Sequence, residues 1–456
     1  MIPVNWRAGL LVLGGPLLFG CNQTLPDGLA LVGATLIDGT GGPPLADAAV
    51  VVRRGRIEWV GARAGFALPK RTSEVDVSGR WIIPGLIDAH AHVATAATWA
   101  PSRYLAWGVT TVRDAHGGLD AVLAFRKHAN SGSANSPRIY VAGAMIDGLP
   151  TTYPDAIGVN GENDARKAVD RLVSAGVDFI KVYTHIDAPL LRAIIDEART
   201  FNIGVAGHLG MTDAVTAAKA GISCIEHMTG VPEAASRDRS ALIAAHYRGF
   251  FPGWTSFERS WADLDSATLT QVAGRLAEEK ITIVPTLVLH ETLSRLDDPA
   301  ILRDPALADV PEAAKRDWDV PGMITRAGWT DSDFAAFRRG RPMQNLFLRA
   351  FSAAGGRIAA GTDSPNQLLV PGFSEHREME LLVGAGLTAR EALRAATRNG
   401  AVLLGVDSLG LLAPGKVADL VILTKDPLVD IRNTRSIEAV MTRGRLLDAD
   451  SIRATW

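Results

Sequence analysis

Two histidines that stand two positions apart, His90 and His92, lie in the apolar segment Ile82–Val93, which we predict to be a strand. Residues two apart on a strand point to the same face, so both imidazoles can be directed at one point. Imidazole nitrogen is a common ligand of zinc and of other divalent metals. Histidines with ordinary hydrogen-bond partners are frequent, so the pair predicts a metal site only if further ligands occur at equivalent positions.

Four further residues of this kind, Lys181, His208, His227 and Asp363, lie on or at the ends of other predicted strands. Lys181 stands inside the apolar segment Phe179–Tyr183, where an ammonium group is costly to bury unless it is paired or chemically altered. Taken singly, each histidine is explained as a hydrogen-bonded core residue, and the aspartate as a helix cap. Taken together, five candidate metal ligands and one unusual lysine favour a joint functional role.

The elements that must position these residues alternate along the middle of the chain. Stretches with apolar residues three and four apart predict helices. The segments between them are rich in Val and Ile, which is typical of parallel strands buried on both faces. Eight such units over roughly 250 or more residues predict an α/β fold, a (β/α)8 TIM-like barrel with catalytic residues at the C-terminal ends of its strands. An open doubly wound sheet is less favoured, because no Gly-rich dinucleotide loop follows the first strand. The predicted strands are Ile82–Val93, Val109–Asp114, Arg138–Met145, Phe179–Tyr183, Gly204–Leu209, Ser223–Met228, Thr282–Leu289 and Ile358–Asp363.

Short β-type segments broken by turns occur at both ends of the chain. We therefore predict a small β-sandwich module built from residues 29–83 and 412–450, and a hydrolase barrel formed by residues 84–411. The connection at about residues 290–349 is unusually long, and we expect it to form a lid-like insertion. The β-type segments are Leu29–Ile37, Ala49–Val52, Arg56–Val60, Ala418–Leu423 and Ile437–Thr442.

The first 21 residues have the order of a secretory signal peptide. A segment with one positive charge, Met1–Arg7, precedes the apolar segment Ala8–Phe19, and small Gly20 precedes Cys21. This order predicts export, and the end of the segment resembles a bacterial lipobox, in which the cysteine is lipidated. The expected location is periplasmic or membrane-anchored. An ordinary export signal and a misassigned start codon are the alternatives, and with the latter the protein is cytoplasmic.

The composition is that of a globular protein, since 47% of the 456 residues are hydrophobic and 21% are charged. The formal net charge of −2 provides no positive field, which argues against nucleic acid or an anionic membrane as a partner. The only membrane contact that we expect is a lipid anchor on Cys21, and a homo-oligomer is left open. Two cysteines make no disulfide framework, and Cys224 lies in an apolar segment typical of the core.

The segment Pro84–His92, which reads Pro-Gly-Leu-Ile-Asp-Ala-His-Ala-His, resembles the first-strand signature of the amidohydrolase superfamily. The four later residues are similar to its fourth-strand Lys, its fifth- and sixth-strand His and its eighth-strand Asp. The segment Gly415–Leu420 resembles the return to the terminal β module in the same proteins. The resemblance covers about Leu29–Leu447 and is strongest to the imidazolonepropionase-like and prolidase-like subgroup.

This resemblance implies a binuclear centre with two divalent metal ions, usually zinc. The histidine pair would bind the more buried ion together with the aspartate, and the two later histidines would bind the second ion. The lysine, carboxylated by carbon dioxide, would bridge them. Without the added carboxylate, an ammonium beside two dications would be strongly repelled. The implied ligands are His90, His92, Lys181, His208, His227 and Asp363.

The chemistry implied is metal-dependent hydrolysis of an amide bond, peptide-like or in an N-acyl amino acid, by a hydroxide that bridges the metals. Asp363 would take the proton of the hydroxide and pass it to the leaving nitrogen. Tyr183, two residues after Lys181 and thus on the same face, is a candidate donor to the developing oxyanion. A packed core tyrosine explains that residue equally well.

Three alternatives remain at this stage. A mononuclear deaminase or an imidazolonepropionase-like hydrolase of cyclic amidines or amides leaves Lys181 without a role. The deaminases also place a Glu three residues after the fifth-strand histidine, where this chain has Met211. An esterase or lactonase would use the same hydroxide. A non-catalytic scaffold would not need the complete ligand set.

The substrate that we expect carries a carboxylate and an apolar or aromatic group. An arginine in a loop at a strand end could bind the carboxylate with two hydrogen bonds, and tryptophans could contact the apolar group. The candidates are Arg259, Arg295, Arg338, Arg339, Arg341, Trp254, Trp261, Trp318 and Trp329.

Overall fold

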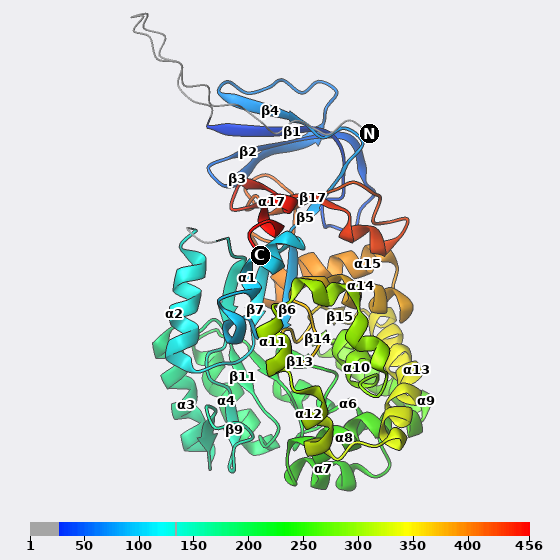
Figure 1. Ribbon diagram of the computed structural model, residues 1–456. Coiled ribbons are helices and arrows are strands. Elements are labelled where there is room, and N and C mark those ends of the chain that lie inside the picture. The colour runs from blue at the N-terminus through cyan, green and yellow to red at the C-terminus, as the bar shows by residue number, and fades with distance from the viewer. Residues whose placement is uncertain (1–26, 133–134) are drawn as a thin grey trace, which may run out of the picture.

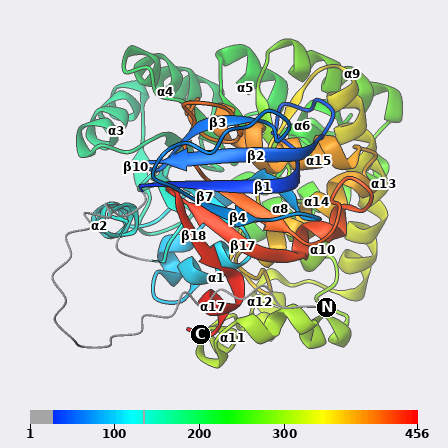
Figure 2. The same cartoon turned by 90° about the horizontal axis from the view of Figure 1, so that it is seen from above.

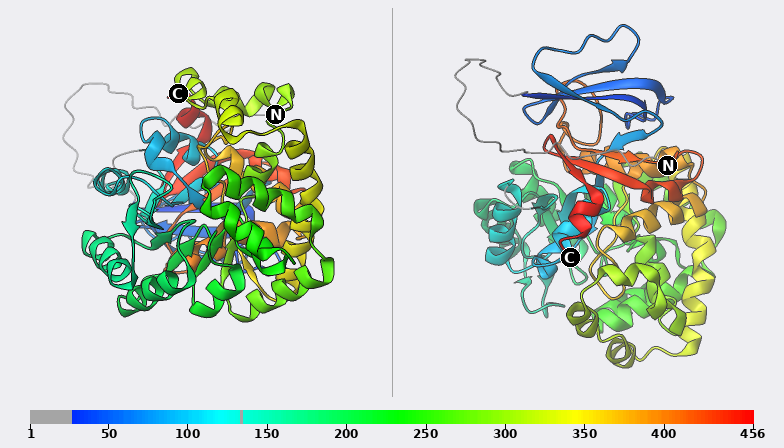
Figure 3. Two further views of the ribbon diagram at one scale, coloured as in Figure 1. Left: turned by 90° about the horizontal axis from the view of Figure 1, so that it is seen from below. Right: turned by 45° about the horizontal axis from the view of Figure 1, so that its top comes forward.

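The computed structural model describes residues 27–132 and 135–456, so the predicted signal peptide and Cys21 lie outside the described residues. One sheet, formed by both ends of the chain, lies at the top of Figure 1, and a larger part of parallel strands and helices lies below it. Figures 2 and 3 show the helices arranged around the periphery of this larger part. Within the described ranges, no helix is both long enough and apolar enough for a membrane span.

The sheet at the chain ends has the strand order β18-β17-β16-β5-β1-β2-β3, and β4 also pairs with β1. The two ends of the chain meet where β5 pairs antiparallel with β16, with Ile83 opposite Val421. Alternate residues of its central strands are fully buried, for example Leu31, Val50 and Ile82, because they face the core cluster of this sheet. Its strands are β1 (Gly28–Leu36), β2 (Leu45–Arg53), β3 (Arg56–Ala62), β4 (Thr72–Asp76), β5 (Trp81–Pro84), β16 (Leu420–Leu423), β17 (Ile437–Thr442) and β18 (Arg445–Asp448).

The larger part contains two parallel sheets, with the strand orders β10-β9-β11-β12-β13-β14-β15 and β6-β7-β8. Nearly every residue of these strands is buried, as expected for strands with helices on one side and a packed interior on the other. The strands are β6 (Leu86–Ala91), β7 (Val109–Asp114), β8 (Arg138–Val141), β9 (Ile146–Gly148), β10 (Ile157–Val159), β11 (Ile180–Val182), β12 (Val205–Gly207), β13 (Cys224–Glu226), β14 (Thr282–Val284) and β15 (Arg357–Ile358).

Backbone hydrogen bonds continue from one parallel sheet to the other at two places. The Ala89 amide of β6 donates to the Ala360 carbonyl, just after β15, at 2.9 Å. At the other edge, the Asp178 amide, just before β11, donates to the Val141 carbonyl of β8 at 2.8 Å. The ends of β6 and β15, which carry predicted ligands, are therefore held side by side.

The helices follow the strands and are delimited by ordinary capping residues. The Asp187 side chain accepts from the Leu190 amide at the start of α4, and Gly176 ends α3 with a φ of 86°. The helices of the larger part are α1 (Ala100–Ala106), α2 (Leu119–Asn130), α3 (Glu162–Ala175), α4 (Ala188–Thr200), α5 (Ala214–Ala220), α6 (Val231–Ala235), α7 (Arg239–Tyr247), α8 (Phe250–Ser260), α9 (Ser266–Glu278), α10 (Leu287–Leu293), α11 (Glu312–Asp317), α12 (Val320–Ala327), α13 (Asp331–Ala353), α14 (Phe373–Gly384), α15 (Ala389–Arg394) and α16 (Gly400–Leu403).

Most of the predicted strands are longer than those observed; for example, the predicted strand Ile358–Asp363 is observed as Arg357–Ile358. The segment Ile82–Val93 is divided at Gly85 into β5 and β6, which belong to different sheets. A Cβ at this glycine would lie 2.1 Å from the Thr110 hydroxyl, so the chain can pass between the sheets here only without a side chain. The segment Thr282–Leu289 is shortened because α10 begins at Leu287. The short strands β9 and β10 were not predicted.

Candidate metal centre

The residues proposed as metal ligands come together at one end of the parallel strands. His90 lies on β6 and Lys181 on β11, while His208, His227 and Asp363 follow the ends of β12, β13 and β15. All five are buried, and His92 is half-buried, with a side chain that is 20% exposed. Parallel strands end at the same edge, which explains why residues so distant in the sequence become neighbours.

The first group of ligands is formed by His90, His92 and Asp363. The Nε2 atoms of the two histidines lie 2.9 and 3.0 Å from the same carboxylate oxygen, Oδ1 of Asp363. Asn366 donates to the other oxygen of this carboxylate at 2.6 Å. Burial alone raises the pKa of Asp363, but the hydrogen bonds from the histidines lower it well below its usual range. The carboxylate is therefore ionised at neutral pH, as a metal ligand must be.

A second aspartate, Asp88, connects the strand that carries His90 with the segment that carries Asp363. Its Oδ1 accepts from the backbone amides of His90 and Thr362, each at 3.1 Å. Its Oδ2 accepts from the Thr362 hydroxyl at 2.6 Å. Asp88 therefore fixes the segment that carries His90 relative to the segment that carries Asp363.

The second group is formed by His208 and His227, whose rings lie 4.9 Å apart. Burial lowers the pKa of both well below the usual value, so both imidazoles are neutral and have a free lone pair. The Thr286 hydroxyl lies 2.7 Å from Nδ1 of His227 and fixes the orientation of this ring. The ring of Trp254 packs against both, at 5.8 and 6.1 Å. Neutral, oriented imidazoles of this kind are suited to bind a metal ion.

Lys181 contacts the buried Glu226, which in turn pairs with the buried Arg113. Its Nζ contacts Oε2 of Glu226, whose Oε1 lies 2.9 Å from Nη1 of Arg113 and 3.0 Å from Nδ1 of His90. The guanidinium also packs over the ring of Phe179, at 3.6 Å. Burial and the neighbouring guanidinium lower the pKa of Lys181 to about 7. The amine is therefore largely available in its neutral, nucleophilic form at mildly alkaline pH.

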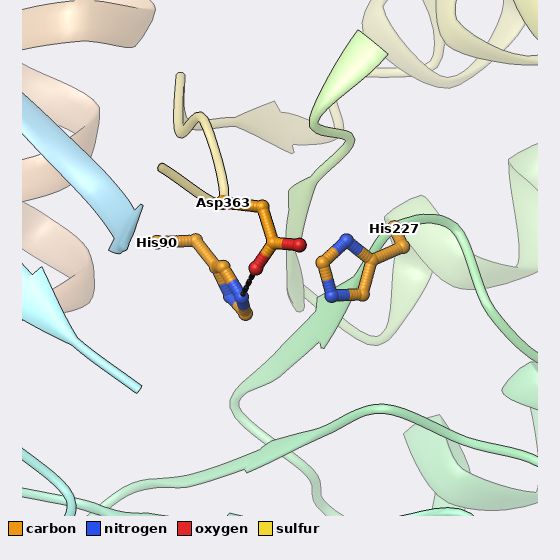
Figure 4. A group of neighbouring side chains, drawn as sticks. All are labelled: His90, His227 and Asp363. Carbon is orange, nitrogen blue, oxygen red and sulfur yellow. Dashed lines mark hydrogen bonds and ion pairs between the residues drawn. The ribbon is translucent and has the colours of Figure 1, made fainter. Parts of the chain in front are cut away.

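The donor set fits a divalent metal ion. One potential ligand atom of each of His90, His227 and Asp363 lies within 4.8 Å of the others, and Figure 4 shows the carboxylate between the two imidazole rings. Burial lowers the pKa of His90 to about 3, so this ring is also neutral. Neutral imidazoles with an ionised carboxylate are typical ligands of zinc.

Tyr183 lies beside the second group. Its ring is 4.6 Å from the ring of His208, and burial raises its pKa well above the usual value. The phenol therefore stays protonated, and its hydroxyl forms a hydrogen bond with Tyr153.

The arginines proposed for a substrate carboxylate do not gather at this site. Arg259 pairs with Asp333, and Arg341 donates to the Leu287 carbonyl. Arg295 and Arg338 bind aspartates of their own insertion, Asp298 and Asp297. For Arg339, the structure provides no contact that links it to the ligands. Of the four tryptophans, Trp254 contacts the ligand histidines, whereas Trp261, Trp318 and Trp329 are buried in the packing of the helices.

Three charged residues that support the site were missed in the sequence, although all three carry the signal that identified Lys181. Arg113 and Glu226 both stand inside apolar predicted strands, where an unpaired charge would be costly. A positive and a negative residue at such positions could have been predicted to pair. Asp88 has the same signal on the strand of His90, two residues before it.

Comparisons with known proteins agree with this arrangement. Residues 81–447 match the model of the amidohydrolase family. The chain is 26% identical to imidazolonepropionase of Streptomyces avermitilis over 395 residues, which cover 83% of this chain and 81% of the relative. It is similar in fold to a solved structure of a putative prolidase from Bifidobacterium longum, with 24% identity, a TM-score of 0.69 and coverage of 95% and 99% of the two chains. For the solved bottromycin amidohydrolase, the identity is 24%, the TM-score 0.71 and the coverage 94% and 89%.

The matched residues include the segments of the proposed ligands and also β16 and β17, with which the chain returns to the sheet formed by its two ends. Members of this family typically use metal ions, in agreement with the cluster of His90, His227 and Asp363. The chain belongs to the amidohydrolase family and is a hydrolytic enzyme that acts on carbon–nitrogen bonds.

Proposed function

We propose that this enzyme hydrolyses the amide bond of a peptide-like substrate or an N-acyl amino acid at a binuclear metal centre. The proposal includes a closed (β/α)8 barrel formed by the two parallel sheets, with a small β-sandwich module built from both chain ends. Backbone hydrogen bonds between the two sheets, from β6 to the segment after β15 and from the segment before β11 to β8, support the closed arrangement.

One observation carries the proposal: five segments distant in the sequence bring neutral imidazoles, an ionised carboxylate and a buried lysine to one place. His90 and His92 already contact the same oxygen atom of Asp363. His90 and His227, from the two groups, have ring centres 4.5 Å apart. If the role of these residues were only structural, apolar residues of similar size would serve it better.

In the proposed centre, the first group would hold one ion and the second group the other, most readily zinc. When bound, two such ions supply an activated water as nucleophile and polarise the carbonyl group of the substrate. Lys181, carboxylated by carbon dioxide, would connect the two groups. Its pKa of about 7 supports this role, because only the neutral amine reacts with carbon dioxide.

Asp363 is proposed to move the proton. Its carboxylate accepts from both histidines of the first group and from Asn366, which holds it in one orientation at the edge of the site. It would take the proton of the attacking water and deliver it to the leaving nitrogen. Tyr183, protonated and beside His208, is the proposed donor to the oxyanion that forms on the carbonyl carbon.

We further propose that residues 1–21 direct export and that Cys21 is lipidated, which would make the enzyme a periplasmic or membrane-anchored bacterial lipoprotein. The order of charged, apolar and small residues in this segment supports the proposal.

The metal centre is tested by metal analysis of the purified enzyme together with hydrolysis assays on N-acyl amino acids and dipeptides. We expect close to two transition-metal ions per chain, loss of hydrolysis on chelation, and its return on adding zinc. A preparation that is fully active with one ion or with none would contradict the binuclear centre.

A further inference from the structure

A cavity of about 520 Å³ lies at the insertion between β14 and β15, within the range of roughly 300–1,000 Å³ for small-molecule sites. Its walls come from the segments around α11 and α12 and from Leu368, which follows Asp363 by five residues. Of the fourteen described residues that line it, nine are apolar and none is a proposed metal ligand. The apolar lining includes Leu296, Leu302, Leu307, Trp318, Ile324 and Leu368.

The apolar part of this lining is suited to an aliphatic chain. Leu302 is 57% exposed, which is unusual for a large aliphatic side chain, whereas Leu307 and Trp318 of the same lining are buried. Exposed apolar surface beside a cavity is typical of a binding site. A chain that enters the cavity would cover Leu302 and gain the free energy of burying its methylene groups.

The charged residues of the lining leave one cation open to an anionic group. Three of them are aspartates, and each forms an ion pair with an arginine outside the lining, so their charges are compensated. Lys315 pairs likewise with Glu312, at 2.7 Å. Arg316 is exposed and acts on Glu312 only at longer range, and its guanidinium forms no hydrogen bond or ion pair with another described residue. The compensated pairs are Asp297–Arg338, Asp298–Arg295 and Asp319–Arg326.

The cavity also touches the segment that holds Asp363 in place. Trp318 of the lining donates from Nε1 to the Pro365 carbonyl at 2.9 Å. The next residue, Asn366, donates to the Asp363 carboxylate at 2.6 Å. Leu368 has a φ of 63°, a left-handed conformation that a leucine rarely adopts and that persists only where its surroundings hold it. A molecule that packs on Leu368 and Trp318 therefore stabilises this segment.

We propose that this cavity binds an aliphatic carboxylate, with its chain against the apolar walls and its carboxylate at Arg316, and that the bound molecule stabilises the segment from Asp363 to Leu368. The cavity is thus a second ligand site of the enzyme, coupled to the position of the Asp363 carboxylate. The inference goes beyond the proposed hydrolysis and does not depend on it, because both of its parts are measured without turnover.

Calorimetric titration of the metal-loaded enzyme with hexanoate, octanoate and decanoate tests the site. Each buried methylene should tighten binding about fourfold, so Kd should fall at least about tenfold from one compound to the next. Arg316→Gln and Leu302→Ser should each weaken octanoate binding about tenfold, through the carboxylate and the chain respectively. The matched controls are Arg303→Gln, an exposed arginine of the same insertion outside the lining, and Leu149→Ser, 58% exposed and also outside it.

Hydrogen–deuterium exchange tests the coupling. The backbone amides of Asn366 and Leu369 donate to carbonyls of the same segment, at 3.2 and 2.9 Å, so they exchange only when the segment opens. With octanoate bound, both should exchange more slowly. At the same octanoate concentration, Arg316→Gln should show less of this protection and Arg303→Gln all of it.

The site is rejected if octanoate does not bind, or if it binds wild type, Arg316→Gln and Leu302→Ser with equal Kd. Equal values are also the result expected if octanoate binds at the metal centre instead, because neither residue lies there. Weakening by the controls to the same extent as by the cavity variants would likewise reject it. Tight binding that leaves the exchange of Asn366 and Leu369 unchanged would overturn the coupling to Asp363.

Discussion

The two groups of proposed ligands differ in what holds their side chains in place. In the first, an ionised carboxylate already holds His90 and His92 at hydrogen-bond distance, and Asp88 fixes both segments from beneath. In the second, His208 and His227 are neutral rings packed among Tyr183 and Trp254. The first group therefore keeps its geometry through charge and hydrogen bonds, whereas the second depends on aromatic packing. We expect the ion of the second group to be held less tightly and to be lost first on chelation.

The largest effect is expected from Asp363→Asn, which keeps the size and one coordinating oxygen but removes the basicity. Because positioned acid–base catalysis contributes roughly 10²–10⁴-fold, kcat should fall by about that factor while the metal content stays near that of the wild type. Steady-state kinetics and metal analysis on the same preparation measure both quantities. Near-normal turnover with full metal would reject the role in proton transfer and leave a helix cap, for which Asn serves as well as Asp.

The next effect concerns the second group. His208→Asn replaces an imidazole by a weaker donor, so it should lose metal as well as rate. Residues that only hydrogen-bond to a metal ligand contribute roughly 10–100-fold to metal affinity. For loss of a ligand itself, we expect at least that decrease in affinity for the second ion, with the first ion retained. Titration with a chromophoric chelator measures the two affinities separately. Equal weakening of both ions would show that the two groups do not act as separate sites.

A smaller effect is expected for Lys181, the proposed bridge between the two groups. With a pKa of about 7 for Lys181, the neutral fraction of the amine should rise about tenfold between pH 6 and pH 8. The sign follows from the lowered pKa: the amine is protonated and unreactive below pH 7, and neutral above it. Carbon-13 NMR with labelled bicarbonate should show a carbamate signal that grows over this range and is absent in Lys181→Met. A signal of constant size would argue against a carbamate at this residue.

The smallest effect on catalysis is expected at Cys21. Cys21→Ser should leave kcat and KM unchanged, since the predicted signal segment precedes both groups of ligands, but it should release the protein from the membrane fraction. Fractionation of cells that carry either form measures this difference. If the wild-type protein already fractionates with the cytoplasm, neither export nor anchoring takes place.

The sequence predicted the ligand residues more completely than the residues that support them. Ligands such as His227 and Asp363 were found because each stands at the end of an apolar segment, and parallel strands bring such ends together. Glu226 and Arg113 carry the same signal as Lys181, a charge inside an apolar strand, but where they lie relative to the ligands depends on which strands are neighbours, and this is decided by tertiary packing. The division at Gly85 was missed for the same reason, since the apolar pattern continues through it while the chain changes sheets.

The expectation of a substrate-binding arginine shows a second limit. Arg259, Arg295 and Arg338 were candidates because they lie in long connections, but each binds an aspartate close to it in space. The sequence contains these aspartates, yet pairing between exposed loops has no periodic pattern from which it could be predicted.

The pairing of β5 with β16 has a consequence for the synthesis of the chain. Strands β1–β5 emerge first from the ribosome, and β5 pairs with β1 on one side, but its other edge finds its partner only when Leu420–Leu423 has been made. At roughly 5–20 residues per second, this edge stays unpaired for on the order of tens of seconds, and an unpaired edge is a template for pairing with another chain. The contact is also remote in sequence, which slows folding more than it costs stability. Light scattering on chains that end before Leu420 would measure how strongly this edge associates.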